Sequence, residues 1–173
     1  LPSVDLINYE ADDLIATYVD QILKKGAKVT IVSSDKDLMQ LYRKDVRLFD
    51  PMKNKFITPE DIMNKFGVEP KKVIDVQSLA GDSSDNIPGV PGIGVKTAAE
   101  LINQYGTLEK LLDNAHEIKQ NKRRETLIEN KDKAIISKKL VTLMKDAPAQ
   151  RKIEEFQLKE IDKEKLYKFL REM

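Results

Sequence analysis

Apolar side chains follow two different spacings within residues 1–80. Between Glu10 and Lys25 they recur every three or four positions, which is the spacing of an amphipathic helix. Three short runs rich in β-branched or aromatic residues predict strands instead: 28–32, 46–50 and 55–57. Two further helical patterns complete the region: 58–67 and 70–80. This mixture predicts an α/β fold that contains part of a parallel sheet.

From Gly81 onward only the helical spacing remains. Four of the seven glycines lie between Gly81 and Gly94, and no strand pattern follows them. The later helical patterns cover residues 97–105, 108–115, 125–130, 134–144 and 164–173. We therefore expect three parts: an α/β core (1–80), an all-helical subdomain (81–152) and a C-terminal helix (153–173) that packs back on the core.

The amino-acid composition excludes several kinds of catalytic or metal site. The 173 residues include no cysteine and one histidine, His116, which excludes a disulfide framework, a thiolate zinc site and a cysteine nucleophile. A bound metal must then be held by oxygen ligands, which favours magnesium or manganese. No apolar run is long enough to predict a membrane span, and the N-terminal residues do not have the pattern of a signal peptide.

The net charge of +1 conceals an uneven distribution. Residues 1–88 carry 12 basic and 15 acidic side chains, whereas residues 89–152 carry 13 basic and 8 acidic ones. An acidic half beside a basic half fits a metal site next to a surface that binds a polyanion. An incidental distribution of solvated surface charge fits the same counts.

Seven carboxylates form three clusters along the chain. The clusters are Glu10, Asp12 and Asp13; Asp35 and Asp37; and Asp82 and Asp85. Each has an ordinary explanation on its own: acids in a first helical turn, a loop or helix cap, and a turn. In one pocket they would need bound cations or shared protons, because two like charges ~4 Å apart cost about 4 kcal/mol at an effective dielectric constant of 20. Two divalent ions held by carboxylates could hydrolyse a phosphodiester without histidine or cysteine.

A glycine-rich turn precedes the helical pattern that begins at Thr97. Gly92 and Gly94 would leave backbone N–H groups open to an anion at the start of the helix, and Lys96 adds a positive charge. A nucleotide-binding P-loop is excluded because Val95 stands where a lysine should follow the last glycine. The turn predicts a helix–hairpin–helix that contacts DNA phosphates without reading bases. An interhelical turn that binds nothing is the alternative.

Four motifs together carry a family resemblance. They are residues 9–13, 34–37, 81–90 and 92–98. In order and spacing they resemble those of bacterial 5′-nucleases, in particular the 5′→3′ exonuclease domain of bacterial DNA polymerase I, which is related to flap endonucleases. The resemblance implies two metal ions, Mg²⁺ or Mn²⁺. The residues it assigns to the first ion are Glu10, Asp12 and Asp13, and those to the second are Asp35, Asp37, Asp82 and Asp85. The residues it assigns to the DNA-binding hairpin, where the family can also hold K⁺, are Gly92, Gly94, Val95, Lys96 and Thr97.

The resemblance also implies partners and a location. We expect duplex, nicked or 5′-flap DNA as substrate in replication and repair, the polymerase part of the same polypeptide as partner, and no membrane or small-molecule cofactor. The expected location is the cytoplasm, in association with the nucleoid. A non-catalytic, structure-selective DNA-binding module is the main alternative; a small-molecule phosphatase would leave the hairpin unexplained.

One departure from the family pattern affects the expected activity. In the family, strands ahead of the first cluster donate further aspartates, and a helical arch handles the 5′ end. Only nine residues precede Glu10. We therefore expect this chain to be the C-terminal portion of the nuclease domain. Its first metal position would be incomplete, and it would show little or no cleavage activity.

Overall fold

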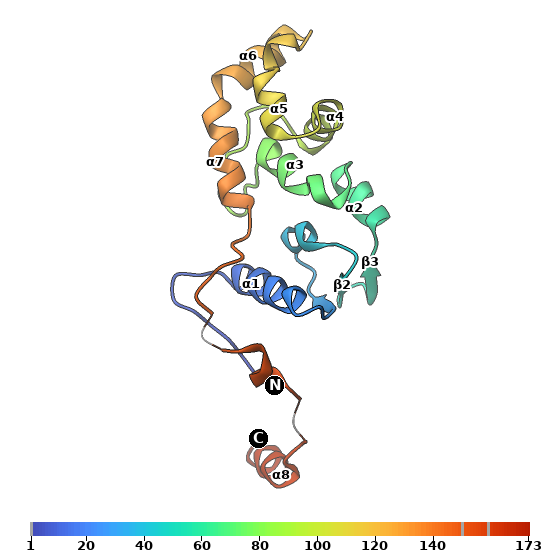
Figure 1. Ribbon diagram of the computed structural model, residues 1–173, viewed down its shortest axis with the longest axis vertical. Coiled ribbons are helices and arrows are strands. Elements are labelled where there is room, and N and C mark those ends of the chain that lie inside the picture. Colours follow the sequence, from blue (N-terminus) through green and yellow to red (C-terminus); the bar gives the residue numbers. More distant parts are fainter. Residues whose placement is uncertain (1, 150, 159) are drawn as a thin grey trace.

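The computed structural model describes residues 2–149, 151–158 and 160–173. A small sheet with α1 beside it lies next to a group of helices, and the C-terminal helix extends away from both (Figure 1). The α/β part contains α1 (Ala11–Lys24), β1 (Val29–Val32), the short 3₁₀ helix η1 (Asp37–Leu41), β2 (Val46–Asp50), β3 (Lys55–Ile57) and α2 (Pro59–Phe66). The predicted α/β class is confirmed, and the three strands lie where the sequence placed them.

The sheet has the order β1-β2-β3. β1 and β2 are parallel, with Val29 opposite Val46, and β2 and β3 are antiparallel, with Leu48 opposite Ile57. The connection between the parallel strands contains η1, so residues 33–37 lie at the carboxyl end of β1. Open α/β sheets place ligands at this end of their strands.

Local sequence signals explain why α2 begins and ends where it does. The Thr58 hydroxyl accepts a hydrogen bond from the backbone N–H of Asp61, whose carboxylate accepts one from the N–H of Thr58. This reciprocal pair is a capping box. Gly67 ends the helix in the left-handed region, with φ of +70°. The predicted start and stop are confirmed.

The second part of the molecule is helical and centres on α3 (Val73–Ala80). Its other helices are η2 (Pro70–Lys72), α4 (Val95–Tyr105), α5 (Leu108–Asp113), η3 (Ala115–Glu117), α6 (Asn121–Glu129) and α7 (Lys131–Val141). α3 packs against both α4 and α7, and its Val73, Val76 and Leu79 are fully buried. In the structure α3 thus lies among the helices, ahead of the glycine-rich segment that begins at Gly81.

The C-terminal segment divides into two elements with different surroundings. The 3₁₀ helix η4 (Ile153–Phe156) packs on α1, where the rings of Tyr18 and Phe156 meet edge to face at 5.1 Å. In contrast, every residue of α8 (Lys163–Glu172) is exposed. Within 153–173, the packing against α1 is thus made by η4, whereas α8 has no buried residue. An amphipathic pattern predicts an apolar face without showing what covers it.

Among the residues that the structure describes, no helix combines the length and apolarity needed to cross a membrane.

Candidate metal centre and hairpin

An open pocket of about 230 Å³ gathers acidic residues from three segments. Its wall includes Glu10 and Asp12 at the start of α1, Asp35 and Asp37 after β1, and Asp85 in the loop after α3. The apolar part of the wall is made by Ile87, Leu140, Val141 and Leu143, together with Ala11. We call this the acidic pocket. The structure therefore brings together side chains from all three predicted clusters.

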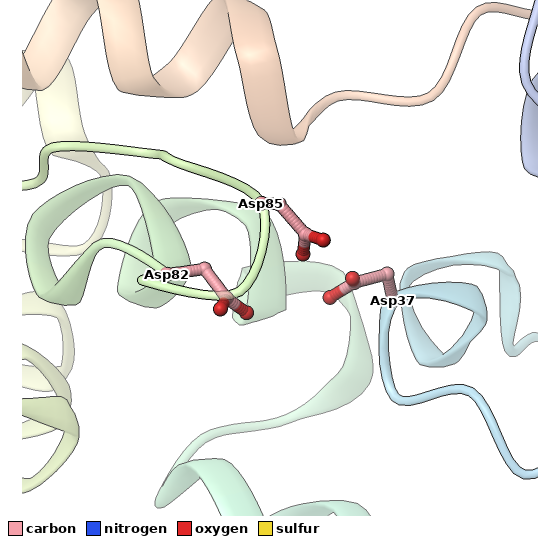
Figure 2. A group of neighbouring side chains, drawn as sticks. All are labelled: Asp37, Asp82 and Asp85. Atoms are coloured by element: carbon pink, nitrogen blue, oxygen red, sulfur yellow. The ribbon is translucent and has the colours of Figure 1, made fainter.

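Three carboxylates form an aspartate triad: Asp37 and Asp85, which line the pocket, and Asp82, which lies beside them without lining it. One oxygen of each lies within 4.8 Å of the others. Figure 2 shows the three side chains pointing toward one another, Asp37 from the start of η1 and the other two from the loop after α3. Carboxylate oxygens in this number and spacing suit a hard divalent cation.

The loop that carries Asp82 and Asp85 is closed by its own backbone. Asp82 and Ile87 exchange two hydrogen bonds, of 2.9 and 2.7 Å. Gly81 and Gly89 lie so close that a Cβ on Gly89 would stand 2.5 Å from the Gly81 nitrogen. The Gly89 N–H donates to the buried hydroxyl of Ser137 on α7, at 2.9 Å. Gly81 and Gly89 thus allow a tight loop, and the hydrogen bond to Ser137 attaches this loop to α7.

Asp37 is oriented by a buried amide that the sequence analysis missed. The Gln77 Nε2 of α3 donates to Asp37 Oδ1, and Gln77 is only 5% exposed. The other amide atom, Oε1, is buried and has no hydrogen-bond partner within the described segments. The Asp37 N–H also donates to Asp35 Oδ1 at 2.9 Å, which ties the two aspartates of the loop together. No local sequence signal marks Gln77, because its partner lies forty positions away.

Lys36 is the second residue that the sequence analysis did not assign. Its Nζ lies 2.5 Å from Asp82, 3.4 Å from Asp37 and 3.9 Å from Asp85. Burial acts to lower the pKa of Lys36, but the hydrogen bond to Asp82 and the neighbouring carboxylates outweigh it, so the pKa is raised. The hydrogen bond from Lys36 lowers the pKa of Asp82. Partial burial, followed by the charges of Asp82 and Asp37, raises the pKa of Asp85.

The other carboxylates that line the pocket, which we call the helix side, are Glu10, Asp12 and Asp35. Within the described residues, neither Glu10 nor Asp12 forms an ion pair with a lysine or arginine. Burial, together with the charges of Asp35 and Asp37, raises the pKa of Asp12 to about 6. The carboxylate of Asp12 therefore keeps its proton to an unusually high pH.

Asp13 does not line the acidic pocket. Its carboxylate accepts a hydrogen bond of 2.8 Å from the backbone N–H of Met144. One turn later, Thr17 accepts a second from Ala147, at 3.1 Å. Asp13 thus helps to attach the segment after α7 to α1, which sets it apart from Glu10 and Asp12.

The glycine-rich turn ends in an uncapped helix. Val90 and Ile93 are buried anchors, whereas Gly92, Gly94, Val95 and Lys96 are exposed and Thr97 is half-buried. α4 begins at Val95, two residues before the predicted start, with Gly94 at its N-cap. No side chain caps this end, and its first turn contains no acidic residue. Its free N–H groups are therefore open to an anion.

Two family models cover nearly the whole chain. Residues 1–67 match the 5'-3' exonuclease, N-terminal resolvase-like domain, and residues 68–164 match the 5'-3' exonuclease, C-terminal SAM fold. The two matches meet just before η2 and α3, which the structure places in the helical part. The prediction that the chain is only the C-terminal portion of a nuclease domain is wrong, because residues 1–67 match the N-terminal domain of the family.

Individual proteins and solved structures of this kind are also similar to the chain. The chain is 50% identical over 173 residues to DNA polymerase I of Rhizobium leguminosarum, covering 100% of the chain and 17% of that protein. It is 39% identical to the 5'-3' exonuclease of Aquifex aeolicus, covering 100% of the chain and 58% of that protein. Among solved structures, a bacteriophage T5 flap endonuclease in complex with DNA and metal ions matches with a TM-score of 0.74 and 25% identity, over 81% of this chain and 52% of that one.

Proposed function

Because the chain belongs to the 5'-3' exonuclease family, we propose that it forms part of a metal-dependent nuclease that removes nucleotides from DNA 5′ ends and cleaves 5′ flaps. The observation that carries this proposal is the aspartate triad of Asp37, Asp82 and Asp85, whose oxygens lie within 4.8 Å of one another. Since the chain spans only 17% and 58% of the two relatives compared above, the activity concerns the whole protein to which it would belong.

The donor set fits Mg²⁺ or Mn²⁺. Among the described residues, every polar side chain that lines the acidic pocket is a carboxylate, which is the hard oxygen ligand these ions prefer. The aspartate triad would hold one ion, and the helix side, with Glu10 and Asp12, would hold the other. When bound, a pair of such ions supplies a water nucleophile at neutral pH and neutralises charge on the phosphate.

The residues of the chain would perform the remaining tasks. Asp12 must lose its proton to serve as a ligand, and in the metal-free chain burial and the neighbouring carboxylates raise its pKa to about 6. Gln77 and the loop around Asp82 hold their carboxylates in place before any substrate arrives. The N–H groups at the start of α4 and the ammonium of Lys96 would bind DNA phosphates, which fixes the duplex without reading its sequence.

The partners follow from the same reasoning. We propose duplex, nicked or 5′-flap DNA as the substrate, and a polymerase part on the same polypeptide, as in the 50% identical DNA polymerase I. Magnesium would be the working ion, with manganese binding more tightly at the same ligands.

The DNA-binding part of the proposal is tested by the salt dependence of affinity. If the hairpin neutralises ~3–4 phosphates, the slope of log affinity against log salt concentration should be about −3. Lys96→Ala should flatten the slope by about one unit on every sequence tested. Lys65→Ala is the matched control, because Lys65 is an exposed lysine of α2 outside the hairpin. Binding that is insensitive to salt, or equally affected by both variants, would contradict the hairpin assignment.

Cleavage is tested separately. Flap, nicked and single-stranded DNA should be incubated, with and without magnesium, with the whole protein to which the chain would belong. Cleavage of the flap that requires magnesium supports the nuclease. Salt-dependent binding without cleavage would instead identify a structure-selective DNA-binding module.

A further inference from the structure

The ammonium of Lys36 lies among the three carboxylates that would bind a metal ion. Its Nζ is 2.5 Å from Asp82, 3.4 Å from Asp37 and 3.9 Å from Asp85. We propose that Lys36 is a built-in counter-cation of the aspartate triad, which stabilises the metal-free state and which a divalent cation must displace. This inference rests on the proposed function, because it takes the triad as the metal-binding site.

Hydrogen bonding leaves one carboxylate oxygen free on each of two triad members. Asp37 Oδ1 accepts from the Gln77 amide, and Asp82 Oδ1 accepts from the Ser84 N–H at 2.9 Å. The remaining oxygen of each, Oδ2, is the one that Lys36 contacts, as is Oδ2 of Asp85. A divalent ion that binds these carboxylates through the three Oδ2 atoms, at ~2.0–2.6 Å, would take the position of the Lys36 ammonium. The ammonium and the ion therefore compete for one position.

Charge explains why the metal-free chain benefits from this lysine. Three carboxylates within 4.8 Å of one another repel strongly, and the repulsion is only partly screened where side chains are half-buried. The sequence places a lysine between the two aspartates of residues 35–37, so the compensating charge comes from the same loop as one of the ligands.

Lys138 provides a matched comparison within the same chain. Its Nζ lies between two carboxylates, 2.7 Å from Asp75 and 2.6 Å from Glu109. Its side chain is 30% exposed and that of Lys36 is 32% exposed. Neither Asp75 nor Glu109 lines the acidic pocket. The two lysines thus have similar ionic surroundings, but only Lys36 would compete with a metal.

The first test measures Mn²⁺ affinity by electron paramagnetic resonance of the free ion, for the wild-type chain, Lys36→Met and Lys138→Met. Lys36→Met should bind Mn²⁺ about tenfold more tightly, the change that corresponds to ~1.4 kcal/mol of removed competition. Lys138→Met should bind it as the wild type does. Without metal, both variants should unfold at lower temperature. Saturating Mn²⁺ should close this gap for Lys36→Met alone, because ligand binding stabilises the folded state by mass action.

A second test uses the unaltered chain, so that it does not depend on a variant folding. An amine-reactive reagent followed by mass spectrometry reports how accessible each lysine is. Adding Mn²⁺ should increase the labelling of Lys36 several-fold and leave that of Lys138 unchanged.

The outcomes separate this inference from the function on which it rests. If the wild-type chain binds Mn²⁺ but Lys36→Met binds it no more tightly, or if metal protects Lys36 from labelling, the counter-cation proposal is overturned and the metal site stands. If neither the wild-type chain nor Lys36→Met binds Mn²⁺, the metal-dependent function itself falls, and this proposal falls with it.

Discussion

The two sides of the acidic pocket hold similar numbers of carboxylates but balance their charge differently. On the triad side, Lys36 contacts Asp37, Asp82 and Asp85. On the helix side, Asp12 has no such partner among the described residues, and its pKa is raised to about 6 by burial and by neighbouring carboxylates. The charge of the triad is thus partly compensated by a lysine, whereas on the helix side the raised pKa of Asp12 lets that carboxyl keep its proton up to about pH 6.

The two sides also differ in how firmly their side chains are held. The triad is supported by the Gln77 amide, by the closed loop between Asp82 and Ile87, and by Ser137 behind that loop. Glu10 is the N-cap residue of α1, and its side chain makes no capping hydrogen bond. A preorganised set of ligands binds an ion with less loss of side-chain entropy, so the triad should be the tighter metal position.

Removing one triad carboxylate should have the largest effect. Asp82→Asn takes away a charge and the oxygen nearest to Lys36, at 2.5 Å. We expect it to weaken Mn²⁺ binding by more than about 100-fold, the upper limit for residues that only support ligands. Isothermal titration calorimetry measures this directly. Glu10→Gln, the matched change on the helix side, should weaken the tightest binding by less than about threefold. Equal losses in the two variants would show that the sides are equivalent.

Removing the amide that supports Asp37 should weaken Mn²⁺ binding less than removing a triad carboxylate does. Gln77→Leu keeps the side-chain volume similar but removes the amide that orients Asp37, and should weaken Mn²⁺ binding by about tenfold. It also removes the buried, unpaired Oε1, so the free energy of unfolding should change little.

Gln40→Leu serves as the control for this change. The Gln40 amide bonds the backbone of Val141 and Leu143, at 2.8 and 3.2 Å, and touches no triad carboxylate. Gln40→Leu should lower the free energy of unfolding more than Gln77→Leu does, and should weaken Mn²⁺ binding less. If Gln40→Leu instead weakened Mn²⁺ binding more than Gln77→Leu, Gln77 would be excluded as a positioning residue.

Features with local signals were predictable from the sequence. The capping box at Thr58 and the stop at Gly67 bound α2 as expected, and the strand runs lie where their β-branched residues predicted. The glycine-rich turn leads into a helix with an open N-terminus, although α4 begins at Val95 rather than Thr97. Each of these depends on contacts within a few residues.

Features that depend on distant contacts were not predictable. The partner of Gln77 lies 40 positions away, and that of Asp13 lies 131 positions away. The helical spacing places Asp13 on one face with Glu10, but it cannot reveal that the backbone N–H of Met144, after α7, donates to the Asp13 carboxylate. The position of α3 within the helical part follows from its packing on α4 and α7, which its amphipathic pattern does not reveal.

The proton on the helix side predicts a pH dependence of stability in the absence of metal. Because the folded chain raises the pKa of Asp12 from 3.8 to about 6, it binds this proton more tightly than the unfolded chain does. The resulting stabilisation is fully present below about pH 4 and is lost as the pH rises through about 6. Asp12→Asn, which is uncharged at every pH, should escape this loss.

Thermal unfolding in a chelator checks this difference. The melting temperature of Asp12→Asn minus that of the wild type should increase by a few degrees from pH 4.5 to pH 7, since solvent screens a partly exposed carboxylate. Asp61→Asn is the control, because the pKa of Asp61 is shifted in the opposite direction. Hydrogen bonds from Lys55 and Thr58 lower it to about 2. The stability that Asp61 contributes is present above its unfolded pKa and is lost only as the pH falls toward 2, so this variant should be less stable than the wild type by a nearly constant amount across the same window. A difference for Asp12→Asn that stays flat or decreases with pH would show that the helix side is not balanced by a proton, and the contrast with the lysine-balanced triad would disappear.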